Sequence, residues 1–276
     1  MNKTEMRNPK TMHIDKASTT EMLKIINEEN MRSVEAVGEA IDSIALAVDA
    51  ITEAMREGGR LIYVGAGTSG RLASADAAEC PPTYGVDYNT VIAVVAGGPS
   101  ALVRASENIE DKGDAGVEAV KAVDLCSRDV VMGISASGNA TFVAEAMLYA
   151  KSLGCKTVSL ANNEKTKIGD IADYPIFCDT GAEVITGSTR MKAGNSQKMV
   201  MNMITTSVMI KLGKVYENMM INLKPTNIKL RDRMIRIVCD ITGLDYESSE
   251  KLLCDNDFVI RRSVEAYNRS TDNEAE

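Results

Sequence analysis

Residues 60–85 read RLIYVGAGTSGRLASADAAECPPTYG, and the rest of the chain is arranged around this stretch. The apolar run at 61–66 predicts a buried strand, and the glycine-rich turn after it carries the hydroxyls of Thr68 and Ser69 at the start of a helix that we expect to end near Ala78. Glycines let a backbone approach an anion closely, while hydroxyls and helix N-terminal amides supply hydrogen-bond donors. The stretch therefore predicts an oxyanion-binding site as well as a fold element.

The pattern of a short apolar run followed by a helical segment recurs and predicts the fold class. Strands are expected at 91–97, 129–135, 155–161 and 174–179. Strands this uniformly apolar are typical of a sheet with helices on both faces. We expect an α/β fold, a doubly wound, mostly parallel sheet in an α/β/α sandwich, with helices before it and a methionine-rich, largely buried helix from about Met191 to Leu212 after it.

Three segments are expected along the chain. Residues 1–17 are polar and predict an arm that is either mobile or ordered against a partner. Residues 18–215 hold the sheet and its helices, and residues 216–276 a small helical appendage with helices at about 226–240, 246–254 and 257–268.

Composition excludes several functional classes. The net charge of -8 argues against a nucleic-acid partner, because such binding depends on Lys and Arg neutralising phosphates. No apolar run approaches the roughly 18 residues of a membrane span, and no signal-peptide pattern is present, so we expect a cytoplasmic protein. The six cysteines lack Cys-x-x-Cys spacing and predict free buried thiols, and a single histidine, His13, excludes a multi-histidine metal site.

Two loops could hold an anionic ligand. Gly65–Gly70 matches the G-x-G-x-x-G dinucleotide pattern, but the next strand ends at Val95–Gly98 without the ribose-binding acid, so a phosphosugar is favoured over a dinucleotide. A ligand-free turn is the remaining interpretation. Ser135–Gly138 is a second hydroxyl loop after a strand, and the carboxyl ends of the strands share one crevice, so we expect the two loops to converge on one ligand.

Carboxylates are the candidate acid and base. Glu79 stands before Cys80-Pro81-Pro82, where we expect a stiff corner and a helix C-terminus whose dipole favours a protonated general acid. A solvent-facing glutamate is the plainer alternative. Glu107 and Glu110 are three residues apart and would share a helix face, which is usually only a solvated acidic surface.

Several segments together resemble the N-acetylmuramic acid 6-phosphate etherase family, part of the sugar isomerase (SIS) group that includes the glucokinase regulatory protein. The resemblance covers roughly residues 15–245, and its most specific parts are ECPPTYG and GSTRMKAG. The segments that carry it are STTEMLKIINEEN at 18–30, GAGTSGR at 65–71, DAAECPPTYG at 76–85, SENIED at 106–111, SASG at 135–138 and GAEVITGSTRMKAG at 181–194.

The resemblance implies a carbon–oxygen lyase that cleaves the D-lactyl ether of a phosphosugar during cell-wall recycling, with no metal or redox cofactor. It implies that Glu79 is the acid and Glu110 the base, and that the protein is a homodimer with shared sites. A non-catalytic phosphosugar-binding regulator and a phosphosugar isomerase are the alternatives. The residues implied to bind the substrate or its phosphate are Thr68, Ser69, Gly70, Glu107, Ser135, Ser137, Gly138, Ser188, Thr189 and Lys192.

This chain departs from the family at two places. It has Asn139-Ala140 where the family commonly has an arginine or similar residue, and the family's C-terminal helical region is usually longer.

Overall fold

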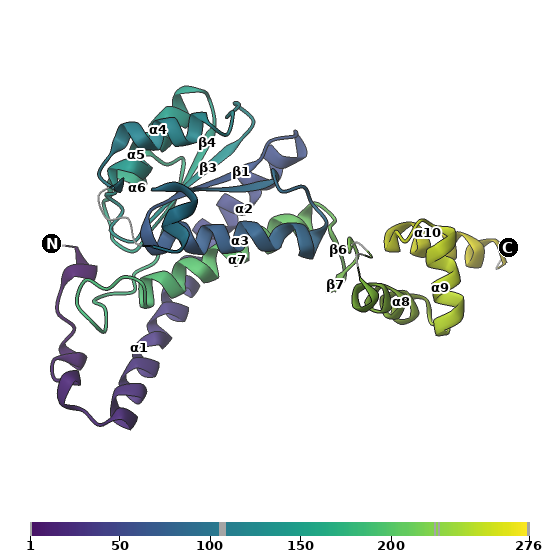
Figure 1. The fold of residues 1–276 in the computed structure, drawn as a ribbon, viewed down its shortest axis with the longest axis horizontal. Coiled ribbons are helices and arrows are strands. Elements are labelled where there is room, and N and C mark those ends of the chain that lie inside the picture. The colour runs from purple at the N-terminus through teal and green to yellow at the C-terminus, as the bar shows by residue number, and fades with distance from the viewer. Residues whose placement is uncertain (1, 105–108, 224, 226, 275–276) are drawn as a thin grey trace. The chain divides into compact units, whose positions relative to one another are not determined.

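The structure is a computed structural model that describes residues 2–104, 109–223, 225 and 227–274. It separates into two compact units (Figure 1). The first comprises Met1–Ala77 and Tyr88–Val208, and the second comprises Ala78–Asp87 and Met209–Glu276.

The first unit is built on a five-stranded parallel sheet in the order β2-β1-β3-β4-β5. From β1 the chain first moves outward to β2 and then returns to the other side of β1 to form β3. This reversal is the topological switch point of an open α/β sheet, where ligands bind outside the carboxyl ends of the strands. The strands are β1 (Leu61–Gly65), β2 (Val91–Val95), β3 (Val130–Ser135), β4 (Lys156–Ala161) and β5 (Tyr174–Phe177).

Helices cover both faces of the sheet, which confirms the expected doubly wound sandwich (Figure 1). On one face, Ile62 and Val64 of β1 pack with α4 (Gly113–Lys121), α5 (Thr141–Ser152) and α6 (Lys167–Ile171). The other face carries α2 (Ile41–Arg56), α3 (Gly67–Tyr84) and α7 (Lys192–Lys211). Alternate strand residues therefore serve two cores, and this is why the strands read as continuous apolar runs.

The N-terminal residues are ordered against the chain itself, so the expectation of a mobile or partner-bound arm is wrong. They form three 3-10 helices, η1 (Lys3–Glu5), η2 (Pro9–Thr11) and η3 (Ile14–Lys16), before α1 (Thr19–Glu39). The Thr4 hydroxyl accepts a hydrogen bond from Asn163 Nδ2 at 3.0 Å, and Thr11 Oγ1 donates to the Val184 carbonyl at 2.8 Å. The local sequence pattern of residues 1–17 did not indicate this ordering, because their hydrogen-bond partners, Asn163 and Val184, lie far along the chain.

Helix α3 does not end at the predicted corner. It continues through Pro81 and Pro82 to Tyr84, and Gly85, with a φ of 66°, follows it. A proline ring has a helical φ but no N–H, so α3 tolerates the two prolines near its end at the cost of two helical hydrogen bonds. The buried methionine-rich helix, α7, is as predicted.

The second unit contains the three expected helices, α8 (Ile228–Thr242), α9 (Tyr246–Asp255) and α10 (Ile260–Glu274), around a small apolar core. An antiparallel pair, β6 (Val215–Tyr216) and β7 (Met219–Met220), precedes them and was not predicted. In the first unit, a short 3-10 helix, η4 (Gly98–Leu102), lies between β2 and α4. Among the described residues, no helix is both long and apolar enough to cross a membrane.

Candidate phosphosugar site

The first predicted loop lies at the carboxyl end of β1, and two glycines hold it close to the sheet. A Cβ on Gly65 would lie 2.8 Å from the Gly70 nitrogen, and a Cβ on Gly70 would lie 2.7 Å from Val95 Cγ1. Only glycine therefore lets α3 start directly against β1 and β2. The first amides of a helix lack helical acceptors and carry its positive dipole end, so this turn presents donors suited to an anion.

The second predicted loop lies beside the first. Gly65 of β1 pairs with Ile134 of β3, so the residues that follow each strand emerge next to one another, as expected. Ser135 Oγ accepts from the Gly138 amide at 3.1 Å, and Ser137 Oγ accepts from the Asn139 amide at 3.2 Å. The two hydroxyl oxygens are 3.3 Å apart, so one hydroxyl can donate to the other, and at least one hydroxyl hydrogen stays available to a ligand.

Gly138 and Asn139 fix the shape of this second loop. Gly138 has a φ of 71°, and a Cβ there would lie 2.3 Å from Thr166 Cγ2. The Asn139 side chain contributes as well. Its Nδ2 donates to the Ser137 carbonyl at 3.1 Å, and its Oδ1 accepts from the Lys167 backbone amide at 3.3 Å. Asn139 therefore supports the loop itself.

Ser69 differs from the two serines of the second loop. It is buried, and its hydroxyl donates to Gln197 Oε1 of α7 at 2.8 Å. Thr68 beside it is half-buried and lies near α7, because a Cβ on Gly194 would be 3.4 Å from Thr68 Cγ2. The start of α3 is thus attached to α7.

Glu110 lies at the same edge of the sheet as the serine loops. Its carbonyl accepts from the Phe142 amide at 2.8 Å, which ties it to the first turn of α5, directly after the Ser135–Gly138 loop. Its side chain is exposed. Glu110 and Asp111 lie in a turn and not on a helix face, and Glu107 lies outside the described residues.

Glu79 is an exposed residue of α3 and belongs to the second unit. The helix continues for five residues beyond it, to Tyr84. The effect of a helix dipole is confined to the last turn, and Glu79 lies before that turn. The prediction that Glu79 stands at a helix C-terminus is therefore wrong.

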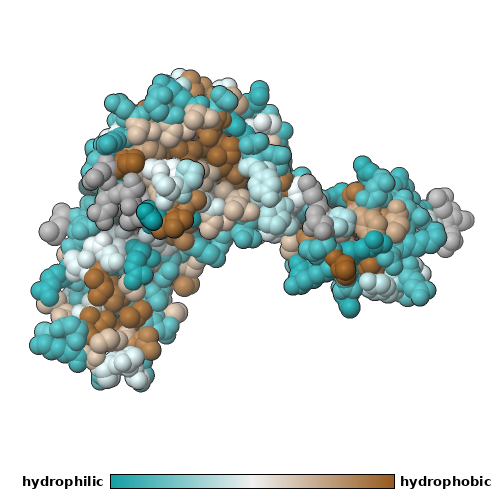
Figure 2. All heavy atoms as spheres, viewed as in Figure 1, coloured by the Kyte–Doolittle hydropathy of each residue, from teal (hydrophilic) through white to brown (hydrophobic). Residues whose placement is uncertain are grey.

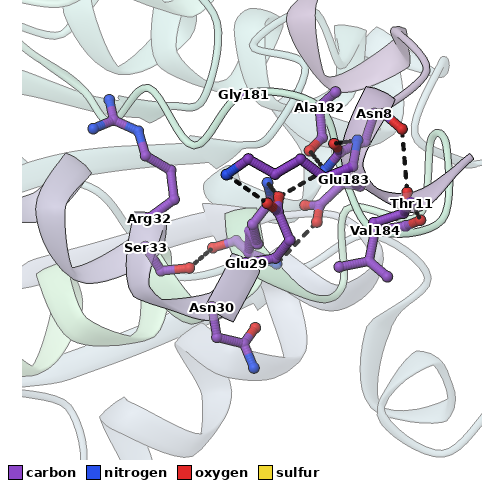
Figure 3. Close-up of polar contacts among 12 residues, drawn as sticks. Asn8, Thr11, Glu29, Asn30, Arg32, Ser33, Gly181, Ala182, Glu183 and Val184 are labelled. Carbon is purple, nitrogen blue, oxygen red and sulfur yellow. Dashed lines mark hydrogen bonds and ion pairs between the residues drawn. The ribbon is translucent and has the colours of Figure 1, made fainter. Parts of the chain in front are cut away.

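The third predicted group, at the start of α7, is divided. Figure 3 shows Glu29 and Glu183, the two acidic residues that bind parts of this segment. The amides of Lys192 and Ala193 donate to the buried carboxylate of Glu183 at 3.0 and 2.9 Å, so Glu183 occupies the N-terminus of α7. Lys192 Nζ donates to Glu29 Oε2 at 2.6 Å, with both side chains buried. Ser188 and Thr189 are half-buried in the preceding loop. The structure thus brings Ser188 and Thr189 close to α7 but places the Lys192 ammonium in an internal ion pair.

Burial and hydrogen bonds set the ionisation of these two glutamates. Burial raises the pKa of Glu183 above its usual value, although its two amide donors oppose this. Burial also acts to raise the pKa of Glu29, but hydrogen bonds from Lys192, Asn8 and Lys10 outweigh it and hold that pKa below its usual value.

Two buried amides near the site were not identified from the sequence, namely Gln197 of α7 and Asn162 after β4. Gln197 lies three and four residues before the buried Val200 and Met201. A polar residue inside the apolar stripe of a helix was the available signal.

Comparison with known proteins places the fold and the family. Residues 43–151 match the glucokinase regulatory protein N-terminal SIS domain family. Among solved structures, a phosphoheptose isomerase from Neisseria gonorrhoeae aligns with a TM-score of 0.54 at 18% identity, over 69% of this chain and 99% of that chain. A phosphoheptose isomerase from Francisella tularensis aligns with a TM-score of 0.52 at 15% identity, over 70% of this chain and 98% of that chain. At such identities these two show the fold alone.

Curated relatives match over nearly the whole chain. The N-acetylmuramic acid 6-phosphate etherase of Halalkalibacterium halodurans is 49% identical over 95% of this chain and 88% of that protein. The etherase of Pectobacterium atrosepticum is 47% identical over 94% and 86%, and that of Bacillus pumilus is 45% identical over 98% and 89%. The chain belongs to the N-acetylmuramic acid 6-phosphate etherase family.

Proposed function

We infer that the protein is an N-acetylmuramic acid 6-phosphate etherase, which cleaves the D-lactyl ether to give N-acetylglucosamine 6-phosphate and D-lactate in peptidoglycan recycling. The observation that carries this inference is identity of 49% to a curated etherase over 95% of the chain. The two adjacent oxyanion loops at the switch point between β1 and β3 support it, because a phosphate monoester needs such donors.

We propose that the reaction is an elimination followed by a hydration, which makes the enzyme a carbon–oxygen lyase. In the open-chain sugar, the C1 aldehyde acidifies the C2 proton. A base removes that proton while an acid protonates the C3 ether oxygen, and D-lactate leaves with the electron pair of the broken C3–O bond. Water then adds across the resulting double bond, with its hydroxyl on C3 and a proton returned to C2. These steps need only a base and an acid of different protonation state.

We assign the base role to Glu110 and the acid role to Glu79. The position of Glu110 at the N-terminus of α5, beside the Ser135–Gly138 loop, supports the first assignment. Glu79 is accessible on α3, which begins at the other loop, and its role rests on the family resemblance. Ser135, Ser137 and the first amides of α3 are proposed to hold the phosphate.

We also propose that the enzyme is a cytoplasmic homodimer with shared sites. The free cysteines support a reducing compartment. Exposed apolar residues on α1 and α2 support a contact with a second copy, and they include Leu23 and Leu46, at 62% and 61% exposure.

A phosphosugar isomerase is the second candidate, because the fold is that of the phosphoheptose isomerase and an isomerase also needs a carboxylate base. The decisive measurement is D-lactate release from N-acetylmuramic acid 6-phosphate by the purified protein. We expect stoichiometric D-lactate and N-acetylglucosamine 6-phosphate. Isomerised sugar without lactate would support the isomerase, and phosphosugar binding without any turnover would support a regulator.

The two glutamates are separable by isotope exchange. We expect Glu79→Gln to lower the rate of lactate release about 10²–10⁴-fold while C2-proton exchange with deuterated solvent continues. Glu110→Gln should lower both rates by a similar factor. Glu118→Gln, a change of an exposed α4 glutamate, is the matched control and should leave both rates unchanged. Near-normal lactate release by the Glu79 variant would refute the acid assignment.

A further inference from the structure

Two fully buried amides connect the loops that hold the candidate phosphate site. Gln197 is 1% exposed and Asn162 is 0% exposed. Ser69 Oγ donates to Gln197 Oε1 at 2.8 Å, and Gln197 Nε2 donates to Asn162 Oδ1 at 3.0 Å. A line of hydrogen bonds therefore runs from the first turn of α3, through α7, to the end of β4.

The line continues to the second loop. The backbone N–H of Asn162 donates to the Ala136 carbonyl at 3.1 Å, and the side-chain Nδ2 of Asn163 donates to the same carbonyl at 2.9 Å. Ala136 stands between Ser135 and Ser137. Asn162 therefore bonds Gln197 through its side chain and the second loop through its backbone, so it is the residue at which the line reaches that loop.

The backbone carbonyl of Cys178 determines which atom donates and which accepts in the side-chain bonds from Asn162 to Ser69. Asn162 Nδ2 donates to the Cys178 carbonyl at 3.0 Å, and a carbonyl can only accept. Asn162 must therefore turn its oxygen toward Gln197, so Gln197 must present its NH₂ group to Asn162 and its own oxygen to Ser69. Ser69 is left as the donor.

This direction decides what Ser69 can do for a phosphate. A hydroxyl has one hydrogen, and the Ser69 hydrogen is committed to Gln197. The oxygens of a phosphate dianion only accept, so Ser69 cannot donate to them while the line is intact. Ser135 and Ser137 accept from backbone amides, and even when one hydroxyl donates to the other, at least one hydroxyl hydrogen remains for a ligand.

We propose that Gln197 is a positioning residue for the phosphate site. Through Ser69 and Asn162 it holds the first turn of α3 and the Ser135–Gly138 loop at the spacing that a phosphate needs, and Ser69 serves the phosphate through this anchorage and not by its own hydroxyl. The proposal rests on the proposed function, since it concerns the same phosphosugar site.

A double-mutant cycle tests the proposal. Binding of N-acetylglucosamine 6-phosphate is measured by calorimetry for Gln197→Met, Ser69→Ala and the double variant, together with KM and kcat for lactate release. We expect each single change to raise the Kd and KM about tenfold and to leave kcat within about threefold, because the site loosens while the carboxylates stay in place. The double variant should be no weaker than the singles, because both changes break one connection.

The control is Thr205→Val on the same helix. Thr205 Oγ1 is a buried hydroxyl that bonds Asp76 Oδ1 at 3.2 Å, about two helical turns beyond Gln197. This change should lower the melting temperature with Kd unchanged, which separates positioning from general stability. If Gln197→Met does not fold, Gln197→Ala takes its place in the cycle, since it removes the bonds to Ser69 and Asn162 without placing a charge in the core.

The outcomes are distinct. Additive losses in the double variant would mean that Ser69 contacts the phosphate independently, and unchanged affinity in the Gln197 variant would mean that the line is only structural. Either result overturns the proposal while lactate release by the unmodified protein still stands. Phosphosugar binding without lactate release by the unmodified protein would instead overturn only the proposed function. Absence of phosphosugar binding would overturn both.

Discussion

At the residue scale, three serines of similar appearance in the sequence have different capacities in the structure. Ser69, Ser135 and Ser137 all follow strands at the same sheet edge. What separates them is the partner of each oxygen. A side-chain acceptor takes the hydrogen of Ser69, whereas Ser135 and Ser137 accept from amides and together keep at least one hydroxyl hydrogen for a ligand. The sequence could predict that hydroxyls gather there, but not which of them donate, because Gln197 and Asn162 are distant along the chain.

Gly138→Ala is expected to damage the second loop. The residue combines a φ of 71° with a site where a Cβ would meet Thr166 at 2.3 Å. We expect a loss of unfolding free energy of about 3 kcal/mol, of which about 1–2 kcal/mol comes from the left-handed backbone. Lactate release should fall as well, because Ser135 and Ser137 would move.

Gly58→Ala is the matched control for this substitution. Gly58 also has a positive φ, of 83°, but a Cβ there would meet nothing within 4 Å. Chemical denaturation should show only the backbone part of the loss, with activity retained. Equal losses in the two variants would contradict the role given to Thr166.

At the element scale, a buried carboxylate joins the starts of β1 and β3. Asp129 is 1% exposed, and its Oδ2 accepts from Arg60 Nη2 at 2.7 Å and from the Cys126 amide at 3.0 Å. Its Oδ1 accepts from the Arg60 amide at 2.9 Å. Burial acts to raise the pKa of Asp129, but these bonds outweigh it and leave the pKa below the ordinary 3.8.

Asp129→Asn should therefore change how stability depends on pH. Because the folded pKa lies below the unfolded one, this carboxylate stabilises the fold fully above about pH 5, and its contribution is lost as the pH falls through the folded pKa. Above pH 5 we expect the variant to be less stable by about 2 kcal/mol. Urea denaturation from pH 7 to pH 3 should show this difference shrinking below about pH 4, and a difference that stays constant would contradict the assignment.

The same scale shows what could and could not be predicted for the elements. Each strand of the five-stranded sheet was predicted because helices on both faces demand an unbroken apolar run, and α7 was predicted because it is apolar on several sides. The predicted end of α3 was wrong. Two prolines usually stop a helix, but α3 continues past them to Tyr84. The ordering of residues 3–16 was missed because it depends on polar contacts with residues beyond 160, which no local pattern contains.

At the scale of the whole molecule, the first unit leaves apolar side chains on the surface of α1 and α2. Leu23, Met31 and Val34 are 62%, 56% and 54% exposed, and their spacing puts them on one side of α1. Figure 2 shows apolar residues gathered along this helix. Contiguous apolar surface of this kind is typical of a protein–protein contact, and a second copy of the chain is the occupant proposed above.

Charge placed on this side of α1 should dissociate the homodimer. We expect Leu23→Glu with Val34→Glu to weaken dimerisation at least 100-fold, because two carboxylates would be buried without partners. Sedimentation at micromolar concentration should then show monomer, and lactate release should fall with it because the sites are proposed to be shared. Leu148→Glu, at a 45% exposed leucine of α5, is the control and should remain dimeric and active. A monomeric double variant with full activity would show that each chain carries a complete site, and an unaltered dimer would place the contact on another surface.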